Sequence, residues 1–317
     1  MNPPEHTIVQ YSGHTDGIIC LAWSPDGMSI ASGGFDKTIR IWDAATGKTK
    51  VVCQAADVVC ALAWAPDGAT LLAGGWNHDI ELWNPSTGDL RTTYETVLGT
   101  VYGLAYAPDG AQFAAAGEKV SDQHAAFPDI APIPLVEVAT GLTRLVYLRH
   151  SGLWITDVAW APKPNGMLIA SAGYDDSTVQ VWHADTAEQV FAASIGHDDE
   201  VFGVTWAPDG RHVAAATARR LFVYEVPSGR LVARTREEEE LRFDAVAWAP
   251  HGRFLAAVDG FDNLPGLYDP FTCMPLYRYH GHEPDIPAGP IAWAPDGSRV
   301  ASAPRSLVHI WTPPELP

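Results

Sequence analysis

A chain of 317 residues with 47% hydrophobic and 18% charged residues has ample apolar material for a folded core, which excludes an intrinsically disordered protein. Its formal net charge of −18 disfavours nucleic acid and anionic membrane surfaces as partners, because both repel an acidic protein. The length alone allows either two ordinary domains or one large all-β domain.

The cysteines and the N-terminal residues indicate a cellular compartment. Cys20, Cys53, Cys60 and Cys273 contain no Cys-x-x-Cys pair, so we expect reduced thiols in the core. The first ten residues include Pro and Glu and lack the basic start and long apolar run of a signal peptide. No apolar stretch reaches transmembrane length. We therefore expect a cytoplasmic protein without a membrane partner.

One short motif, an aromatic residue followed by a turn of Pro and Gly, recurs seven times along the chain. Its usual form is Trp-Ala-Pro-Asp-Gly, as at residues 64–68 and 206–210. The seven copies begin at Trp23, Trp64, Tyr106, Trp160, Trp206, Trp248 and Trp293. Successive copies start 41 to 54 residues apart, close to the period of about 40–45 residues expected for one four-stranded propeller blade. The longest interval locates an insertion in the third repeat.

The first repeat predicts the strands of one blade. Residues 18–23 and 29–32 form the first two expected strands, and residues 38–42 form the third. Proline presets φ for a turn and glycine accepts positive φ, so the motif between the first two strands is a turn. A second turn at 43–47 leads into the fourth strand. Related third strands are expected at 80–83, 178–182, 221–224 and 308–311.

The two ends of the chain predict how the ring closes. The last repeat stops after its third strand at Trp311, whereas a spare strand stands at residues 7–11. We expect this strand to complete the last blade, which removes exposed sheet edges. The predicted fold is one all-β, seven-bladed β-propeller of four-stranded antiparallel blades over residues 1–317. The expected blades are 14–54, 55–97, 98–150, 151–196, 197–238, 239–281, and 282–317 completed by 6–12.

With these repeats, the sequence resembles the WD-repeat (WD40-type) family over essentially the whole chain. Blade 1 carries the family's Gly-His and Trp-Asp dipeptides almost in full. The resemblance implies a structural tetrad of hydrogen-bonded side chains across this blade, formed by His14, Ser32, Asp36 and Trp42. Blade 4 offers similar candidates in His150, Ser171, Asp175 or Asp176, and Trp182.

Other blades depart from the family pattern. Blade 2 has Ala55 in place of the histidine and Asn77 in place of the aspartate, and blade 3 retains none of the tetrad positions. The regular Trp-Ala-Pro-Asp-Gly motif is also similar to bacterial WD-repeat proteins, some of which are sensor or partner modules. These departures weaken the tetrad prediction for blades 2 and 3, while the fold prediction rests on the repeat itself.

Motifs for catalysis, metal binding and cofactors are missing from the sequence. It has no Gly-rich phosphate loop, no Gly-x-Ser-x-Gly elbow and no His-Glu-x-x-His. His280, His282 and Glu283 have metal-capable side chains, but Gly-His is the dipeptide that the family places before a blade. Asp198, Asp199 and Glu200 lack the spacing of a calcium loop. We predict no catalytic residue, no metal and no cofactor.

Aromatic residues recur in the turns between second and third strands. These residues are Phe35, Trp76, Tyr174 and Phe261. In WD-repeat propellers these turns emerge on one face together with the loops between blades, here called the top face. By the same resemblance, the residues four before each motif line the channel mouth there: Ile19, Cys60, Tyr102, Thr156, Phe202, Asp244 and Gly289.

Rigid aromatic residues are frequent anchors in recognition sites. The sequence therefore predicts a partner-binding surface on the top face, edged by Glu200. This surface consists of Phe35, Trp76, Tyr102, Trp154, Tyr174, Phe202, Arg242 and Asp244. The alternative is that several of these rings pack between blades or against loops, as large side chains commonly do.

Two further segments have either a functional role or no role beyond being solvated surface. The insertion at 117–134 contains Phe127-Pro128 and further prolines, and long loops on rigid scaffolds either carry function or are simply tolerated. Glu237 to Glu240 either meet a basic partner or are solvated. The arginines before them are interpreted as solvated surface: Arg219, Arg220, Arg230, Arg234 and Arg236.

The leading hypothesis is a non-catalytic scaffold for a protein or peptide of unknown identity, acting as a subunit of a larger complex or as a sensor module. One alternative is an enzyme or small-molecule binder that uses the central channel, as in propellers of other families. Another is an architectural subunit held through its blade edges.

Overall fold

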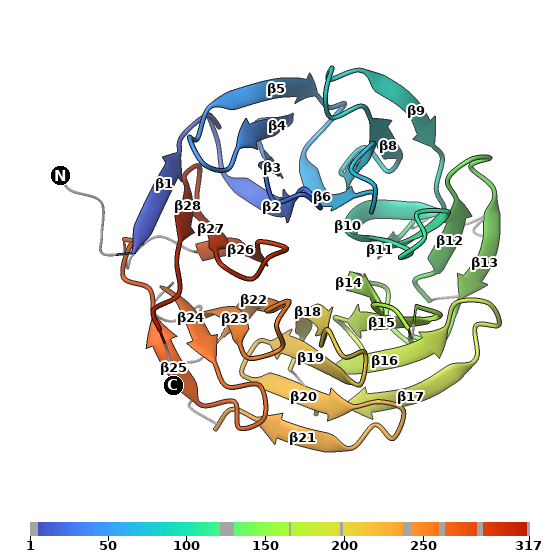
Figure 1. The fold of residues 1–317 in the computed structure, drawn as a ribbon. Helices are drawn as coiled ribbons and strands as arrows, with labels where there is room; N and C mark the ends of the chain where they lie inside the picture. Colours follow the sequence, from blue (N-terminus) through green and yellow to red (C-terminus); the bar gives the residue numbers. More distant parts are fainter. Residues whose placement is uncertain are drawn as a thin grey trace.

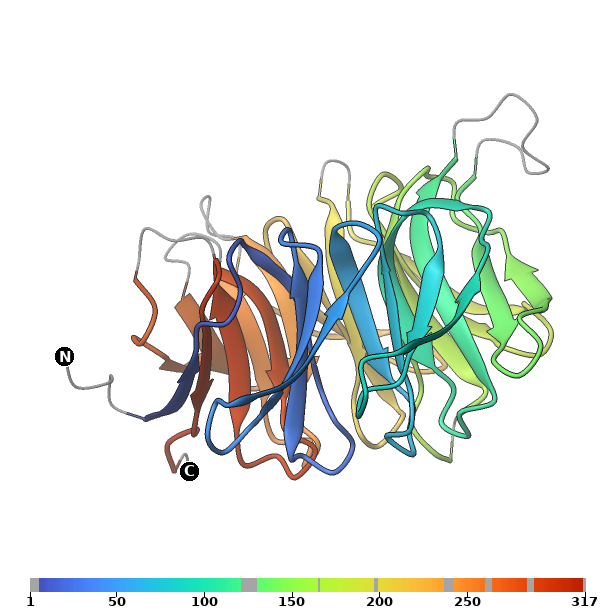
Figure 2. The same cartoon turned by 90° about the horizontal axis from the view of Figure 1, so that it is seen from above.

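The computed structural model describes residues 6–120, 130–164, 166–196, 199–236, 242–259, 264–283 and 288–315. They form seven four-stranded antiparallel sheets set as blades around a central channel (Figure 1). Seen from the side, the ring is a disc whose strands run between its two faces (Figure 2). The all-β, seven-bladed propeller predicted from the sequence is therefore confirmed. In the ranges described, no helix is long and apolar enough to cross a membrane.

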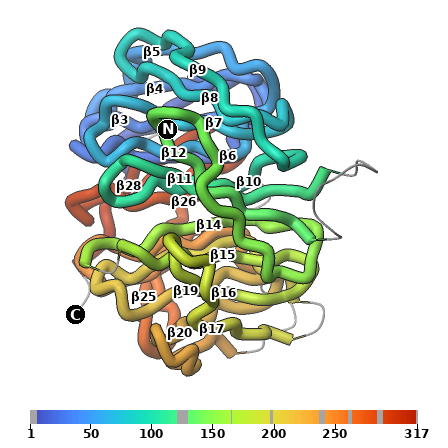
Figure 3. Tube along the Cα trace, turned by 90° about the vertical axis from the view of Figure 1, so that its right-hand side faces the viewer, coloured from blue at the N-terminus to red at the C-terminus, as the bar shows by residue number. Residues whose placement is uncertain are grey.

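Each blade uses four strands, ordered from the channel outward, and neighbouring blades stack around the ring (Figure 3). The innermost strands are β2 (Ile18–Trp23), β6 (Val59–Trp64), β10 (Leu98–Tyr106), β14 (Ile155–Trp160), β18 (Val201–Trp206), β22 (Phe243–Trp248) and β26 (Ala288–Trp293). The second strands are β3 (Ser29–Gly34), β7 (Leu71–Gly75), β11 (Gln112–Lys119), β15 (Leu168–Gly173), β19 (His212–Thr217), β23 (Leu255–Asp259) and β27 (Val300–Pro304).

The five third strands whose ranges were expected from the sequence, in blades 1, 2, 4, 5 and 7, agree with those ranges to within one residue. The third strands are β4 (Thr38–Asp43), β8 (Ile80–Trp83), β12 (Ile133–Glu137), β16 (Thr178–His183), β20 (Leu221–Glu225), β24 (Leu264–Tyr268) and β28 (Val308–Trp311). The outermost strands are β5 (Thr49–Gln54), β9 (Leu90–Tyr94), β13 (Thr143–Tyr147), β17 (Gln189–Ser194), β21 (Leu231–Arg234), β25 (Pro275–Arg278) and, in the last blade, β1 (Thr7–Tyr11).

The recurring Pro-Asp-Gly turn joins first and second strands because its own groups satisfy one another. In blade 1 the Gly27 N–H donates to the Ser24 carbonyl at 2.9 Å, and the Met28 N–H donates to Asp26 Oδ1 at 2.9 Å. Gly27 has a φ of +69°, which residues with a side chain rarely adopt. The motif is thus explained by turn geometry.

The aromatic residue of the motif ties one blade to the next. The Trp64 Nε1–H donates to the Ala22 carbonyl of the preceding blade at 3.1 Å. The same contact to the preceding blade is made by Trp23, Trp206 and Trp293. In blade 4, where the turn is longer, Trp160 donates to the Gly166 carbonyl of its own turn instead. In blade 6, Trp248 likewise donates to the Gly252 carbonyl of its own turn. One repeated packing position thus accounts for four of the six motif tryptophans.

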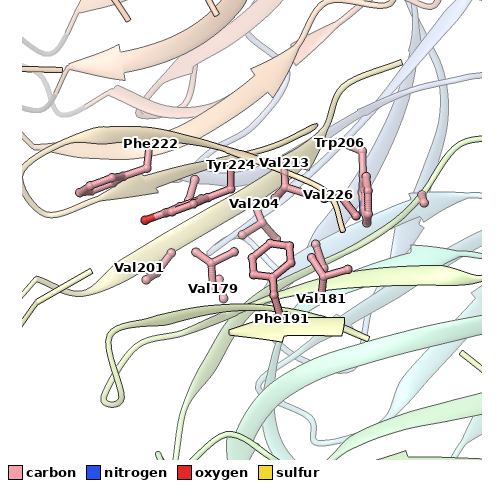
Figure 4. Close-up of a cluster of buried hydrophobic side chains, with 14 residues drawn as sticks. Val179, Val181, Phe191, Val201, Val204, Trp206, Val213, Phe222, Tyr224 and Val226 are labelled. Carbon is pink, nitrogen blue, oxygen red and sulfur yellow. The ribbon is translucent and has the colours of Figure 1, made fainter. Parts of the chain in front are cut away.

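The hydrophobic core lies between adjacent blades. Between blades 4 and 5, Val181 and Phe191 pack in one cluster with Val204 and Trp206, all of them buried (Figure 4). Equivalent clusters join other pairs of neighbouring blades. Apolar burial contributes about 25 cal/mol per Å², so these contacts between sheets hold the ring together and fix the positions of the loops on its faces.

The N-terminal strand closes the ring, as the sequence predicts. β1 pairs antiparallel with β28, with Tyr11 opposite Val308. The Thr7 hydroxyl is hydrogen-bonded to the Tyr279 hydroxyl in the loop before the last blade. Tyr11 is buried and stacks on Trp42 of blade 1, with ring centroids 4.4 Å apart. The closing strand therefore contacts the connection from blade 6 through Thr7 and the third strand of blade 1 through Tyr11.

The ends of the blade 3 insertion lie against blade 4. The Lys119 N–H donates to the Leu153 carbonyl at 2.8 Å, and the Ala131 N–H donates to the Gly152 carbonyl at 2.9 Å. Residues 121–129, which include Phe127-Pro128, lie outside the described residues. A role for the insertion stays a prediction.

Candidate functional site

The innermost strands bring their channel-facing residues together at the centre of the ring. A cavity of about 220 Å³ is lined there by six of the seven residues expected from the sequence, namely Ile19, Cys60, Tyr102, Thr156, Phe202 and Asp244. In the last blade the lining residues are Pro290 and Ile291, in place of Gly289. The one-residue difference falls where Pro290 follows Gly289 and the pairing of β26 with β27 shifts register.

Phe35 and Trp76 form an exposed aromatic pair on the top face. Each ring follows the last glycine of a second strand, and the turn is held by the Phe35 N–H donating to the Gly17 carbonyl and the Trp76 N–H to the Val58 carbonyl. The two rings are T-shaped, with centroids 5.9 Å apart. They are 46% and 47% exposed, so the pair is presented to solvent and not packed between blades.

A second aromatic cluster runs across blades 4 to 6. Trp154 lies 5.3 Å from Tyr174, and Tyr174 lies 5.8 Å from Phe202, measured between ring centroids. The Arg242 guanidinium lies over the Phe202 ring at 4.7 Å and donates from Nε to Asp244 Oδ1 at 2.5 Å. The backbone fixes this arrangement, since the Tyr174 N–H donates to the Trp154 carbonyl. Five of the eight expected binding residues are thereby in one cluster.

The structure divides the expected ring of aromatics into two clusters. Tyr102 stands on the innermost strand of blade 3, where it lines the channel, and burial raises the pKa of its hydroxyl. The Tyr102 hydroxyl is hydrogen-bonded to the side chain of Thr100. Within the described ranges, the Tyr102 ring forms no pair with another aromatic ring. Phe261 lies outside the described residues. The Phe35–Trp76 pair and the Trp154–Tyr174–Phe202–Arg242 cluster are below called the aromatic pair and the aromatic ladder.

The blade 1 side chains that the family resemblance selects are hydrogen-bonded to one another. His14 Nδ1 lies 2.8 Å from Asp36 Oδ2, and His14 Nε2 lies 2.7 Å from Ser32 Oγ. The Trp42 Nε1–H donates to Ser32 Oγ at 3.2 Å. Burial lowers the pKa of His14. Burial also opposes ionisation of Asp36, but hydrogen bonds from Thr38 and from the backbone outweigh it and keep the Asp36 pKa low.

Blade 4 repeats this arrangement. His150 Nε2 lies 2.8 Å from Ser171 Oγ, and the Trp182 Nε1–H donates to the same oxygen at 3.2 Å. His150 Nδ1 lies 2.9 Å from Asp176 Oδ2, whereas Asp175 accepts from the backbone of Leu153. Asp176 is thus the aspartate of this blade.

Other blades use substitutes for the missing side chains. In blade 2 the buried Glu81 accepts from the backbone of Ala56 at 3.2 Å, from Asn77 at 3.3 Å and from Trp83 at 3.1 Å. In blade 7 the Trp311 Nε1–H donates to Ser302 Oγ, which lies 3.0 Å from His282 Nε2. His282 thus fills a structural position. Sequence reasoning missed Glu81, although a glutamate two residues before the blade tryptophan was a visible signal.

A buried carboxylate that the sequence did not single out also lines the channel. Asp157 of β14 accepts from the Val158 N–H at 2.8 Å and from the Val204 N–H of the next blade at 3.0 Å. Burial raises the pKa of Asp157 to about 7, although part of the residue still faces the channel. Its two hydrogen bonds make it a link between blades 4 and 5. In the described ranges, no group of three or more His, Cys, Asp or Glu side chains is placed to hold a metal ion.

Seven four-stranded blades around a channel, two of them with a His-Ser-Asp-Trp hydrogen-bond network, define a repeat β-propeller. Residues 5–43, 47–84, 143–183 and 189–225 match the family model for the WD domain, G-beta repeat. The chain belongs to the WD40-repeat β-propeller family. The likeness of its motifs to bacterial members stays a prediction.

Curated relatives share the repeats at low identity. The chain is 24% identical over 218 residues to the ribosome biogenesis protein WDR12 homolog of Nematostella vectensis, which covers 68% of this chain and 39% of that protein. It is 28% identical to cell division cycle 20.1, cofactor of APC complex, of Arabidopsis thaliana, covering 43% and 30%. It is 27% identical to the nuclear distribution protein nudF of Aspergillus niger, covering 80% and 54%. The chain thus spans between about a third and about half of the length of these relatives.

Proposed function

We propose that this protein is a non-catalytic scaffold that binds a protein or peptide through the top face. The observation that carries the proposal is the aromatic ladder, in which Trp154, Tyr174 and Phe202 come from two adjacent blades and Arg242 from a third. Trp154 is 39% exposed, and the aromatic pair adds further apolar surface. Exposed aromatic and arginine side chains on a rigid frame lose little conformational entropy on binding, which makes them effective anchors.

The relatives support a role within an assembly. One is described as the cofactor of APC complex, and another as a ribosome biogenesis protein. By analogy, we propose that this chain acts as a subunit of a larger complex or as a partner module, in the cytoplasm. The net charge of −18 supports a protein partner over nucleic acid.

A second candidate function is a small-molecule binder or enzyme in the channel. The cavity of about 220 Å³ with the carboxylates of Asp157 and Asp244 favours it. The two functions differ in the residues they need, because a channel ligand does not contact Phe35 or Trp76. Loss of partner binding on removal of those two rings therefore separates the first function from the second.

The double substitutions F35A/W76A and W154A/F202A test the top face. We expect a protein that co-purifies with the wild type to be lost from both variants. The affinity should fall by about a hundredfold or more, because each of the two anchoring rings contributes about 2 kcal/mol. Affinity purification from the native host with mass spectrometry measures the loss, and a thermal melt verifies folding.

The matched control is M28A/L142A, which removes two side chains that are 66% and 65% exposed and lie in turns outside the top-face surface. This control should retain the partner. A partner that both aromatic variants retain would place the interface on the blade edges or the opposite face, as an architectural subunit requires.

A further inference from the structure

Three arginines gather around one groove between blades 5 and 6. Arg234 ends β21, Arg236 follows two residues later, and Arg278 ends β25. β21 and β25 are the outermost strands of neighbouring blades, and the groove between them has a volume of about 380 Å³. The described residues that line it include no Asp and no Glu. On a protein of net charge −18, this is a local basic site.

Two of the three positive charges are not matched by a described carboxylate. The Arg278 Nη2 donates to Asp259 Oδ2 at 3.0 Å, and Asp259 is buried, so this pair is fixed in place. Arg234 and Arg236 are exposed, and in the part of the chain that the structure describes their guanidinium groups form no ion pair and no hydrogen bond. The groove therefore presents two positive charges beside a preorganised third arginine.

The groove also has a hydroxyl donor and an apolar lining. Thr235 is buried, and its Oγ1 accepts from the Leu221 N–H at 3.1 Å, which leaves its hydroxyl hydrogen available to a ligand. Phe243 and Tyr268 are buried in the lining. Met274, which is 59% exposed, lies at the same groove and offers apolar surface to an extended chain.

We propose that this groove binds a phosphorylated serine or threonine in an extended segment of a partner protein. A phosphate dianion balances the charges of Arg234 and Arg236, and guanidinium groups bind phosphate oxygens in pairs. Arg278 and the Thr235 hydroxyl supply further donors, more than the two oxygens of a carboxylate require. The acidic surroundings repel nucleic acid and anionic membranes, so a single anion on a peptide chain suits the groove better than a polyanion.

This site is separate from the top-face surface. None of the eight residues of that surface lines the groove, so failure of one proposal leaves the other untouched. The two surfaces also differ in chemistry, since the top face offers aromatic rings and the groove offers guanidinium groups.

The test uses the full chain and a degenerate peptide array with a central phosphoserine, beside arrays with serine and with glutamate at that position. We expect the phosphoserine array to bind about tenfold or more tightly than the serine array, and inorganic phosphate to compete. R234Q/R236Q should lose this preference while its thermal melt stays that of the wild type. R91Q/R211Q, which removes two exposed arginines elsewhere for the same change in charge, should keep it.

Three results would overturn the proposal. The first is equal binding of the phosphoserine and glutamate arrays, and the second is an unchanged preference in R234Q/R236Q. The third is binding of the phosphoserine array that appears only after Glu237 to Glu240 are changed to glutamine. That result would mean that the chain's own acidic run, which follows Arg236, competes with the peptide for the groove.

Discussion

Replacing Trp182 with alanine lowers the free energy of unfolding by about 3–5 kcal/mol, the usual cost of removing a fully buried tryptophan. Trp182 is 0% exposed and stacks on Tyr147, with ring centroids 4.3 Å apart. Its Nε1–H donates to Ser171 Oγ, which also contacts His150. The alanine variant therefore creates a cavity and removes one donor from the blade 4 hydrogen-bond network. Chemical denaturation measures the effect.

Two variants show whether this interpretation is right. W182F keeps a stacked ring and loses the hydrogen bond, so it should cost less than W182A, about 1–3 kcal/mol. M167A removes a side chain that is 52% exposed and should change stability by about 0.5 kcal/mol or less. If W182A were no more destabilising than M167A, the buried position of Trp182 would be contradicted.

Protonation of His309 should lower the free energy of unfolding as the pH falls. We expect a loss of about 3 kcal/mol between pH 6.5 and 4. His309 is buried, and burial lowers its pKa from 6.5 to about 4. Between these values the unfolded chain takes up a proton on His309 that the folded chain does not. The stabilising contribution is therefore complete above pH 6.5 and is lost as the pH falls towards 4.

The structural reason is the position of His309 beside the closing strand. Its Nδ1 lies 2.9 Å from the Tyr279 hydroxyl, which is also bonded to Thr7 of β1, and its Nε2 lies 3.4 Å from Gln10 Nε2. H309Q keeps a polar side chain without a proton to gain. Thermal melts of both proteins from pH 7.5 to 4.5 should show a smaller acid loss in H309Q, and parallel curves would contradict the assignment.

Turn chemistry made most of the fold predictable. Each Pro-Asp-Gly turn marks the end of one strand and the start of the next. The turn requires a positive φ, such as the +69° of Gly27, and glycine adopts this conformation more readily than residues with a side chain. The strand ranges 7–11, 80–83 and 308–311 were predicted to the residue, since turns and hydrophobic alternation bound them closely. These signals are local, so one sequence is enough to read them.

Contacts between blades were harder to predict because they join residues more than 40 positions apart. Nothing in the sequence distinguishes Asp157 from an ordinary strand residue. In the structure its Oδ2 accepts a hydrogen bond from the Val204 N–H of the next blade. Glu81 is a different case, because its partners Asn77 and Trp83 are close to it in sequence. Its position two residues before the blade tryptophan is a local signal, whereas the partner of Asp157 on the next blade is not.

The candidate surfaces show the same limit. The positions of the top-face aromatics follow from the turns, but their division into a pair and a ladder depends on ring orientations across blades. From the sequence alone, Arg234 and Arg236 are expected to be solvated surface, because the acidic run from Glu237 follows them. Arg278, which stands more than 40 residues away, is what turns them into the lining of a groove.

Hydrogen–deuterium exchange of the full chain, free and bound to its co-purified partner, tests the central proposal most directly. The account predicts slower exchange in the top-face turns at 34–38, 75–79 and 173–177, while the turns of the opposite face at 25–28 and 66–69 stay unchanged. Protection limited to those opposite turns, or to the outermost strands, would contradict binding through the aromatic top face.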